Sequence, residues 1–162
     1  GVQTCALPIL LRFLKMHFAL DWRGVHGAPH WARVRHNGLR LAASTGANLR
    51  VVEAFAFLHD SCRQDDYSDP DHGFRAAELA TKINDTFLYL DETELSLLVY
   101  ACEGHSTGRL EGDVTVQTCW DADRLDLGRV GIRPVAAKLC TAAARDPSFI
   151  AWAYARSFAN EP

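Results

Sequence analysis

VVEAFAFLHD, residues Val51–Asp60, is the stretch that decides the fold: an almost unbroken apolar run that ends in a histidine and an aspartate. A segment with so little polar surface belongs at the centre of a core. As a helix it places Phe55 and His59 on one stripe, with Asp60 about 100° further around the axis. A buried carboxylate is costly unless it is paired or binds a metal, and imidazole is the commonest metal ligand. The run therefore predicts a buried polar site whose other members lie elsewhere in the chain.

Helices are predicted before this run from apolar stripes and capping residues. An amphipathic pattern spans Leu10–Leu20, and a second helix runs from Pro29 to Gly46, a typical C-terminal residue. Gly38 lies on the same face as His30 and permits close packing there. Asn48 is the expected N-cap of the central helix.

Further helices are predicted after an acidic, turn-forming loop at Ser61–Asp71. They are expected from His72 to a break at Asn84-Asp85, from the capping box Asp91–Glu94 to His105, around Val116–Asp123, over Val135–Ala144 and over Ser148–Phe158. The sequence therefore predicts an all-α bundle of about six to eight helices, formed by residues 10–162 as a single domain. Residues 1–9 show no periodicity and are expected to be a non-native leader.

Composition narrows the class of protein. A chain of 162 residues with 48% hydrophobic and 23% charged residues is typical of one soluble globular domain. No apolar run reaches the roughly 18 residues of a membrane span. A net charge of −3 with scattered basic residues disfavours duplex nucleic acid as a partner. Five cysteines without a CxxC pair indicate reduced thiols and a cytoplasmic protein.

Six possible metal ligands stand at helix ends or on buried stripes: His30, His59, Asp60, His72, His105 and Asp123. A single buried histidine is more often a hydrogen-bonded core residue than a metal ligand. Six donors on five helices favour a metal site. The stripe through Trp120 selects Asp123, whereas Asp121 should point elsewhere. Mixed imidazole and carboxylate ligands suit a divalent transition ion such as Mn, Fe, Zn, Ni or Co.

These residues resemble a known family. His30 in HWARV, the doublet His59-Asp60 in LHDS and Asp123 in DADRLD are similar to the H…HD…D signature of the HD superfamily of metal-dependent phosphohydrolases. The resemblance runs from about residue 25 to residue 144. It implies an HD-type helical bundle in which His30, His59, Asp60 and Asp123 bind one metal. His72 and His105 resemble the extra histidines of binuclear members, so one or two ions are expected.

The resemblance also implies a reaction. A small phosphate ester or nucleotide would be hydrolysed by metal-activated water, which Asp60 would orient. His72 and His105 would bind a second ion, contact phosphate or supply a proton. Arg63 and Arg124 are candidates for binding the phosphate. For each of them, an ion pair with the acidic loop is an equally good interpretation.

Two other functions stay open. Some HD-type proteins, including those that resemble myo-inositol oxygenase, use six ligands to hold two irons and activate dioxygen. A metal-stabilised helical module without catalysis is the third hypothesis. Aromatic side chains that could stack on a nucleobase, Trp31, Phe55 and Trp120, are more simply interpreted as core. Lys138 and Arg133 are weaker candidates for binding the phosphate.

Overall fold

The computed structural model describes residues 7–158, and within this range the chain forms helices and no strand. The α-helices are α1 (Leu7–His17), α2 (Ala28–Thr45), α3 (Leu49–Leu58), α4 (His72–Ile83), α5 (Glu92–Gly104), α6 (Val114–Arg124), α7 (Ala142–Arg145) and α8 (Pro147–Ser157). A π-helical turn η1 (Asn84–Leu88) and two 3-10 turns, η2 (Leu127–Val130) and η3 (Ala136–Lys138), complete the elements. The predicted all-α bundle of six to eight helices is confirmed.

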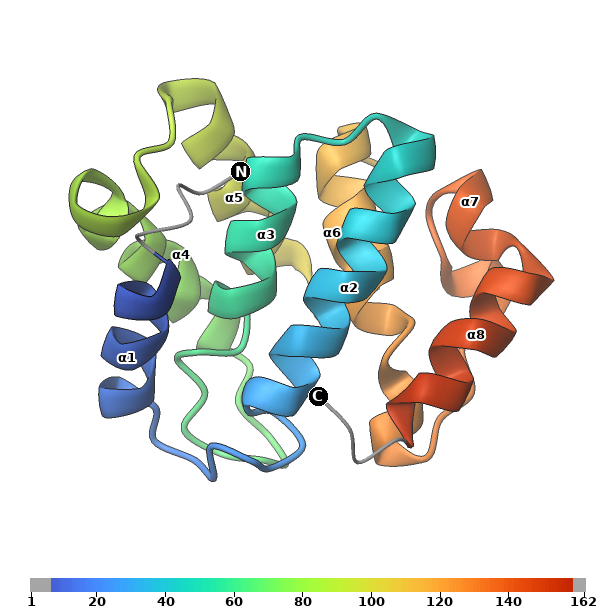
Figure 1. Cartoon of the computed structure of the whole chain (residues 1–162), viewed down its shortest axis with the longest axis horizontal. Helices are drawn as coiled ribbons and strands as arrows, with labels where there is room; N and C mark the ends of the chain where they lie inside the picture. The colour runs from blue at the N-terminus through green and yellow to red at the C-terminus, as the bar shows by residue number, and fades with distance from the viewer. Residues whose placement is uncertain (1–6, 159–162) are drawn as a thin grey trace.

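Helix α3 is the centre of the bundle. All of its residues from Val51 to Leu58 are buried, and α2, α5 and α6 pack around it (Figure 1). Its N-terminus is capped as expected, because the Asn48 side chain accepts hydrogen bonds from the backbone N–H groups of Arg50 and Val51. The His-Asp doublet that follows α3 is thereby carried into the middle of the protein.

Two glycines allow the helices around the doublet to approach closely. A Cβ atom on Gly38 of α2 would lie 2.5 Å from Cγ1 of Val52, so only glycine allows this approach to α3. A Cβ atom on Gly73 of α4 would lie 2.5 Å from the carbonyl oxygen of Cys102. The first contact sets α2 against α3, and the second brings the start of α4 to the end of α5.

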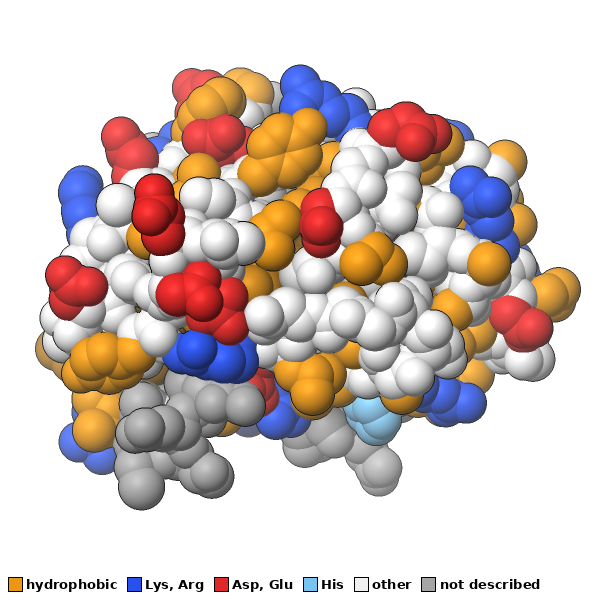
Figure 2. Space-filling model, turned by 90° about the horizontal axis from the view of Figure 1, so that it is seen from above, with side chains coloured by type: hydrophobic (Ala, Val, Ile, Leu, Met, Phe, Trp, Pro, Cys, Tyr) orange, Lys and Arg blue, Asp and Glu red, His pale blue; other side chains and the backbone are white. Residues whose placement is uncertain are grey.

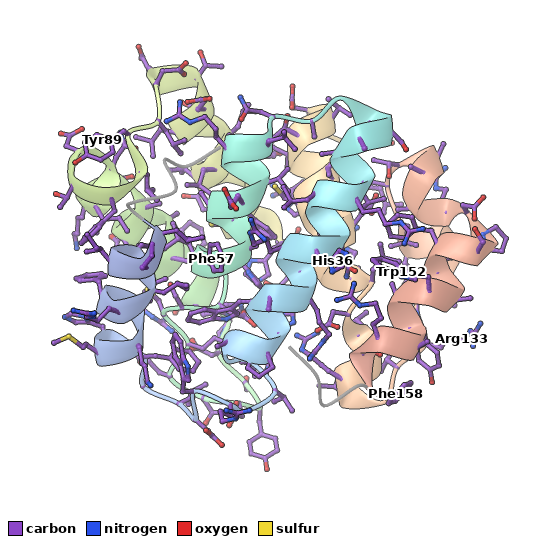
Figure 3. The ribbon with its side chains drawn as sticks, in the orientation of Figure 1. His36, Phe57, Tyr89, Arg133, Trp152 and Phe158 are labelled. Atoms are coloured by element: carbon purple, nitrogen blue, oxygen red, sulfur yellow. The ribbon has the colours of Figure 1, made fainter. Side chains whose placement is uncertain are left out.

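The C-terminal elements form a smaller apolar cluster beside α2. Leu41, Leu125, Leu139, Ile150 and Ala153 make its buried centre. His36 of α2 and Trp152 of α8 point toward one another, with ring centroids 5.3 Å apart (Figure 3). Helix α8 is thus held against the outer face of α2.

Several predicted boundaries were wrong. Helix α1 begins at Leu7, inside the segment predicted as a leader, and ends at His17 rather than Leu20; residues 1–6 lie outside the described range. The break at Asn84-Asp85 is instead the π-helical turn η1, which is followed by Tyr89 with a φ of 50°. No continuous helix covers 135–144, because the Asp121 carboxylate accepts hydrogen bonds from the backbone N–H groups of Cys140 and Thr141 and turns the chain between η3 and α7.

The surface has no large region of one charge on the face shown in Figure 2, where acidic and basic side chains are scattered among apolar ones. Among residues 7–158, no helix combines the length and the apolar character that crossing a membrane requires.

Candidate metal centre

Six predicted ligands meet in the interior. They are His30 from α2, His59 and Asp60 from the end of α3, His72 from the start of α4, His105 from the end of α5 and Asp123 from α6. The four histidines and Asp60 are at most 5% exposed, and the Asp123 side chain is 15% exposed. The structure therefore brings together donors that are separated by up to 93 residues in sequence.

One group of donors surrounds His30 and His59. Their Nε2 atoms lie 3.0 Å apart. Oδ2 of Asp60 lies 3.6 Å from Nε2 of His30 and 3.7 Å from Nε2 of His59. Oδ1 of Asp123 is 3.4 Å and 3.7 Å from the same two nitrogens. His30, His59 and Asp60 thus form a compact group of donor atoms, and Asp123 lies beside its two imidazoles.

The second group uses the other oxygen of Asp60. Oδ1 of Asp60 lies 3.2 Å from Nε2 of His72 and 3.6 Å from Nε2 of His105. The two imidazole nitrogens are 2.8 Å apart. Asp60 therefore lies between two pairs of imidazoles, with one carboxylate oxygen directed at each pair.

Hydrogen bonds on the far side of each ring fix the tautomer. Nδ1 of His30 faces Oδ2 of Asp126 at 2.7 Å, and Nδ1 of His59 faces the Phe55 carbonyl oxygen at 3.1 Å. Nδ1 of His105 faces the carbonyl oxygen of Cys102 at 2.6 Å, and Nδ1 of His72 faces that of Asp69. Because each of these partners only accepts, each Nδ1 carries the proton and donates it. In the neutral rings, Nε2 is left with a lone pair.

This arrangement fits a metal ion. Two Nε2 lone pairs at 3.0 Å or 2.8 Å repel each other unless a proton or a cation lies between them. A divalent ion bound by both nitrogens removes that repulsion, and an imidazole fixed through Nδ1 is the usual form of a histidine metal ligand. His30, His59 and Asp60 form one group that could hold an ion, and Asp60, His72 and His105 form another.

The protonation states of His59, Asp60 and Asp123 agree with this interpretation, whereas at His105 the effect of Asp60 outweighs burial and raises the pKa. Complete burial lowers the pKa of His59 to about 3, so its imidazole is neutral at pH 7. Burial opposes the ionisation of Asp60, but the surrounding imidazoles outweigh it and hold its pKa well below the ordinary value. For Asp123 too, burial raises the pKa and the neighbouring imidazoles lower it. The net result is a lowered pKa. The centre therefore combines a neutral nitrogen donor with ionised carboxylates.

Asp121 has a structural role, as the helical stripe predicted. Its carboxylate accepts hydrogen bonds from the backbone of Cys140 at 2.6 Å and from the backbone and hydroxyl of Thr141 at 2.8 Å. Asp123, two residues later, is the carboxylate of α6 that faces the histidines.

The two arginines that were predicted to bind phosphate make different contacts. Nη1 of Arg63 lies 3.6 Å from Oδ1 of Asp60 and 3.3 Å from Nε2 of His72, at the edge of the centre. The Arg124 guanidinium instead donates to the carbonyl oxygens of Arg109 and Lys138 and to the sulfur of Cys140. Arg124 thus ties the 138–140 segment to α6, which leaves few of its donors for a ligand.

Three polar residues at the centre were missed or given little weight by sequence reasoning. Nδ1 of His26 lies 2.9 Å from Oδ2 of Asp60, and its Nε2 is 3.3 Å from the Asp66 carbonyl oxygen. Asp126 contacts His30 and also accepts from Arg33. Arg129 places Nη2 3.9 Å from Oδ1 of Asp123. The only sequence signal for Asp126 and Arg129 was their position just after Asp123 in DADRLDLGR.

A cavity of about 620 Å³ opens onto the centre. Asp60, His72, His105 and Asp123 lie at its polar end, together with Arg63 and Arg129. Trp31, Phe55 and Trp120 do not line it and are fully buried, as the core interpretation predicted. A small molecule can therefore reach the candidate ligands.

No protein-family model, curated protein or solved structure matches the chain.

Proposed function

We propose that this protein is a metal-dependent phosphohydrolase that cleaves a small phosphate ester or nucleotide with water. The observation that carries the proposal is the position of Asp60, whose two oxygens face two pairs of buried imidazoles at the polar end of an accessible cavity. A divalent transition ion bound there supplies a Lewis acid that activates water and polarises a phosphoryl oxygen.

The chain's own side chains bind the phosphate, orient the water and hold the proton. Arg63 and Arg129 border the carboxylates and line the same cavity, so they bind the phosphate dianion and set the phosphorus beside Asp60. Asp60 orients the attacking water, because an ionised carboxylate accepts a hydrogen bond from it. Water adds oxygen to phosphorus, the ester P–O bond breaks, and the leaving alcohol takes up a proton. With one ion bound, His72 and His105 remain free to contact phosphate or to hold that proton.

The test begins with protein that is purified without a histidine tag and loaded with manganese, iron, zinc, nickel or cobalt. Turnover of p-nitrophenyl phosphate, phosphomonoesters and nucleotides is measured for wild type, Asp60→Asn and the control Asp85→Asn, which changes an exposed carboxylate on η1. We expect loss of turnover of a hundredfold or more for Asp60→Asn alone. Unchanged turnover in Asp60→Asn with bound metal contradicts the assignment.

A second candidate function is a di-iron oxygenase. It is favoured by one specific feature, the Asp60 carboxylate near both imidazole pairs, because a carboxylate that could be shared by two ions would suit dioxygen chemistry as well as hydrolysis. Iron-loaded protein that shows a visible absorption band and consumes oxygen, without hydrolysing any ester, would favour this alternative. Protein that unfolds on metal removal and neither hydrolyses esters nor consumes oxygen would be the non-enzymatic helical module.

A further inference from the structure

The cavity above the centre has two chemically different ends. Its polar end carries the carboxylates, the imidazoles and two arginines described above. The same cavity is also lined by the aliphatic residues Leu110, Leu127, Ile132, Pro134, Val135 and Leu139, called the aliphatic wall below, with Arg124, Arg133 and Lys138 beside them. Most of this wall comes from the segment 127–139, between α6 and α7. A ligand with its phosphate at the polar end therefore has its body against hydrocarbon.

The wall lacks the groups that recognise a nucleobase. Among the residues that line the cavity, none is a phenylalanine, tyrosine or tryptophan, none is an asparagine or glutamine, and Ser106 is the only neutral hydroxyl. A base needs a ring face to stack on and partners for its polar edge. The indole N–H groups of Trp31 and Trp120 donate to the carbonyl oxygens of His26 and Ala101, away from the cavity.

Two wall residues are left open to solvent. Ile132 is 53% exposed and Val135 is 51% exposed, although both line the cavity. An exposed aliphatic wall that continues into a charged site is stabilised when an apolar ligand covers it. Of the cations that line this part of the cavity, Arg133 packs its guanidinium over the Tyr154 ring at 4.9 Å, beside α8 (Figure 3). Arg124 donates to backbone carbonyl oxygens, and Lys138 is exposed.

Charge complementarity fixes the orientation of the ligand. Arg129 donates from Nε to the Val25 carbonyl oxygen and from Nη1 to that of Asp126, which holds its Nη2 near Asp123. Arg63 lies on the other side, near Asp60 and His72. A dianionic phosphate is attracted to this end, and hydrocarbon is favoured at the other.

We propose that the ester cleaved here is a monoalkyl phosphate, whose aliphatic chain lies along the wall that includes Ile132 and Val135. This inference rests on the proposed phosphohydrolase function and narrows its substrate class. It selects esters of aliphatic alcohols over nucleotides.

The first experiment measures kcat/KM for n-alkyl phosphates from methyl to octyl, beside nucleoside monophosphates. Each buried methylene contributes about 0.8 kcal/mol, so kcat/KM should rise about fourfold per methylene until the wall is covered. Ile132→Ser and Val135→Ser should each flatten this rise. Ile9→Ser is the matched control, because Ile9 is 60% exposed on α1 and does not line the cavity. It should keep the wild-type slope.

A flat series, or nucleotides hydrolysed faster than octyl phosphate, would overturn the substrate class while leaving the hydrolase intact. A second measurement separates the two proposals. Binding of n-alkylphosphonates, which cannot be hydrolysed at a P–O ester bond, is followed by calorimetry on the metal-loaded protein. Affinity that rises with chain length without turnover of any ester would support the wall as an alkyl site and refute the phosphohydrolase. Affinity independent of chain length would refute the alkyl site by itself.

Discussion

His30 and Asp126 are joined by a hydrogen bond in which Nδ1 of the imidazole donates to Oδ2 of the carboxylate over 2.7 Å. The other carboxylate oxygen, Oδ1, accepts from Nε of Arg33, also at 2.7 Å. Arg33 fixes Asp126, Asp126 fixes the His30 ring, and the ring directs Nε2 at His59. A residue of the loop after α6 thus orients a ligand on α2.

We expect Asp126→Asn to weaken metal binding about 10- to 100-fold, because loss of such an outer partner typically has an effect of that size. Metal affinity is measured by competition with a chelator of known strength. Asp85→Asn serves as the control, and circular dichroism establishes that the variant is folded. An unchanged affinity in a folded Asp126→Asn protein would show that Asp126 supports only the fold.

Metal content separates a mononuclear from a binuclear centre. If two ions bind, elemental analysis should give about two per chain in wild type, and His72→Ala or His105→Ala should reduce this to about one, because each substitution removes a donor of only one group. His59→Ala should reduce binding at the other group. One ion in wild type, retained in both His72→Ala and His105→Ala, would leave those histidines to phosphate or proton transfer.

Removing metal should destabilise the protein. A ligand present at 100 times its dissociation constant stabilises the folded state by about 2.7 kcal/mol, and chelation reverses this. It also returns the two pairs of Nε2 atoms at 3.0 Å and 2.8 Å to mutual repulsion. Thermal unfolding with and without chelator measures the change. Equal melting temperatures would show that the imidazole pairs hold no ion.

The thiol of Cys140 should make stability depend on alkaline pH. Burial raises the pKa of Cys140 to about 12, whereas an unfolded thiol titrates near 8.5. Between these values the unfolded chain loses a proton that the folded protein keeps, so stability present at lower pH is lost as pH rises. From pH 8 to pH 10, the free energy of unfolding should fall by about 1 kcal/mol more in wild type than in Cys140→Ala. Urea unfolding at both pH values measures this difference, and an equal fall in both proteins would contradict it.

Local signals predicted most of the helices and the polar side chains that meet in the interior. Asn48, Asp91 and Gly46 mark helix ends by forming caps with their own neighbours, so the sequence around them contains the needed information. The candidate ligands could be selected because buried stripes carried polar residues that an apolar core would not place there. Such stripes depend only on helical periodicity.

Contacts between distant segments were not predictable in the same way. The expected helix over 135–144 is broken by the carboxylate of Asp121, which belongs to another element. Arg124 likewise donates to the backbone carbonyl oxygens of residues 109 and 138, which belong to other segments of the chain. Nothing in the local pattern of residues 124–129 indicates that Asp126 supports His30 or that Arg129 faces the cavity.

The spacing of the ligands along the chain has a consequence for biosynthesis. His30 and His59 are made early, but Asp123 and the supporting Asp126 are made only after α4, α5 and most of α6. Contacts between such distant residues form late, because the long segments between them must first be ordered. A nascent or truncated chain therefore offers only part of the donor set. Stable retention of an ion would distinguish a finished chain from an incomplete one.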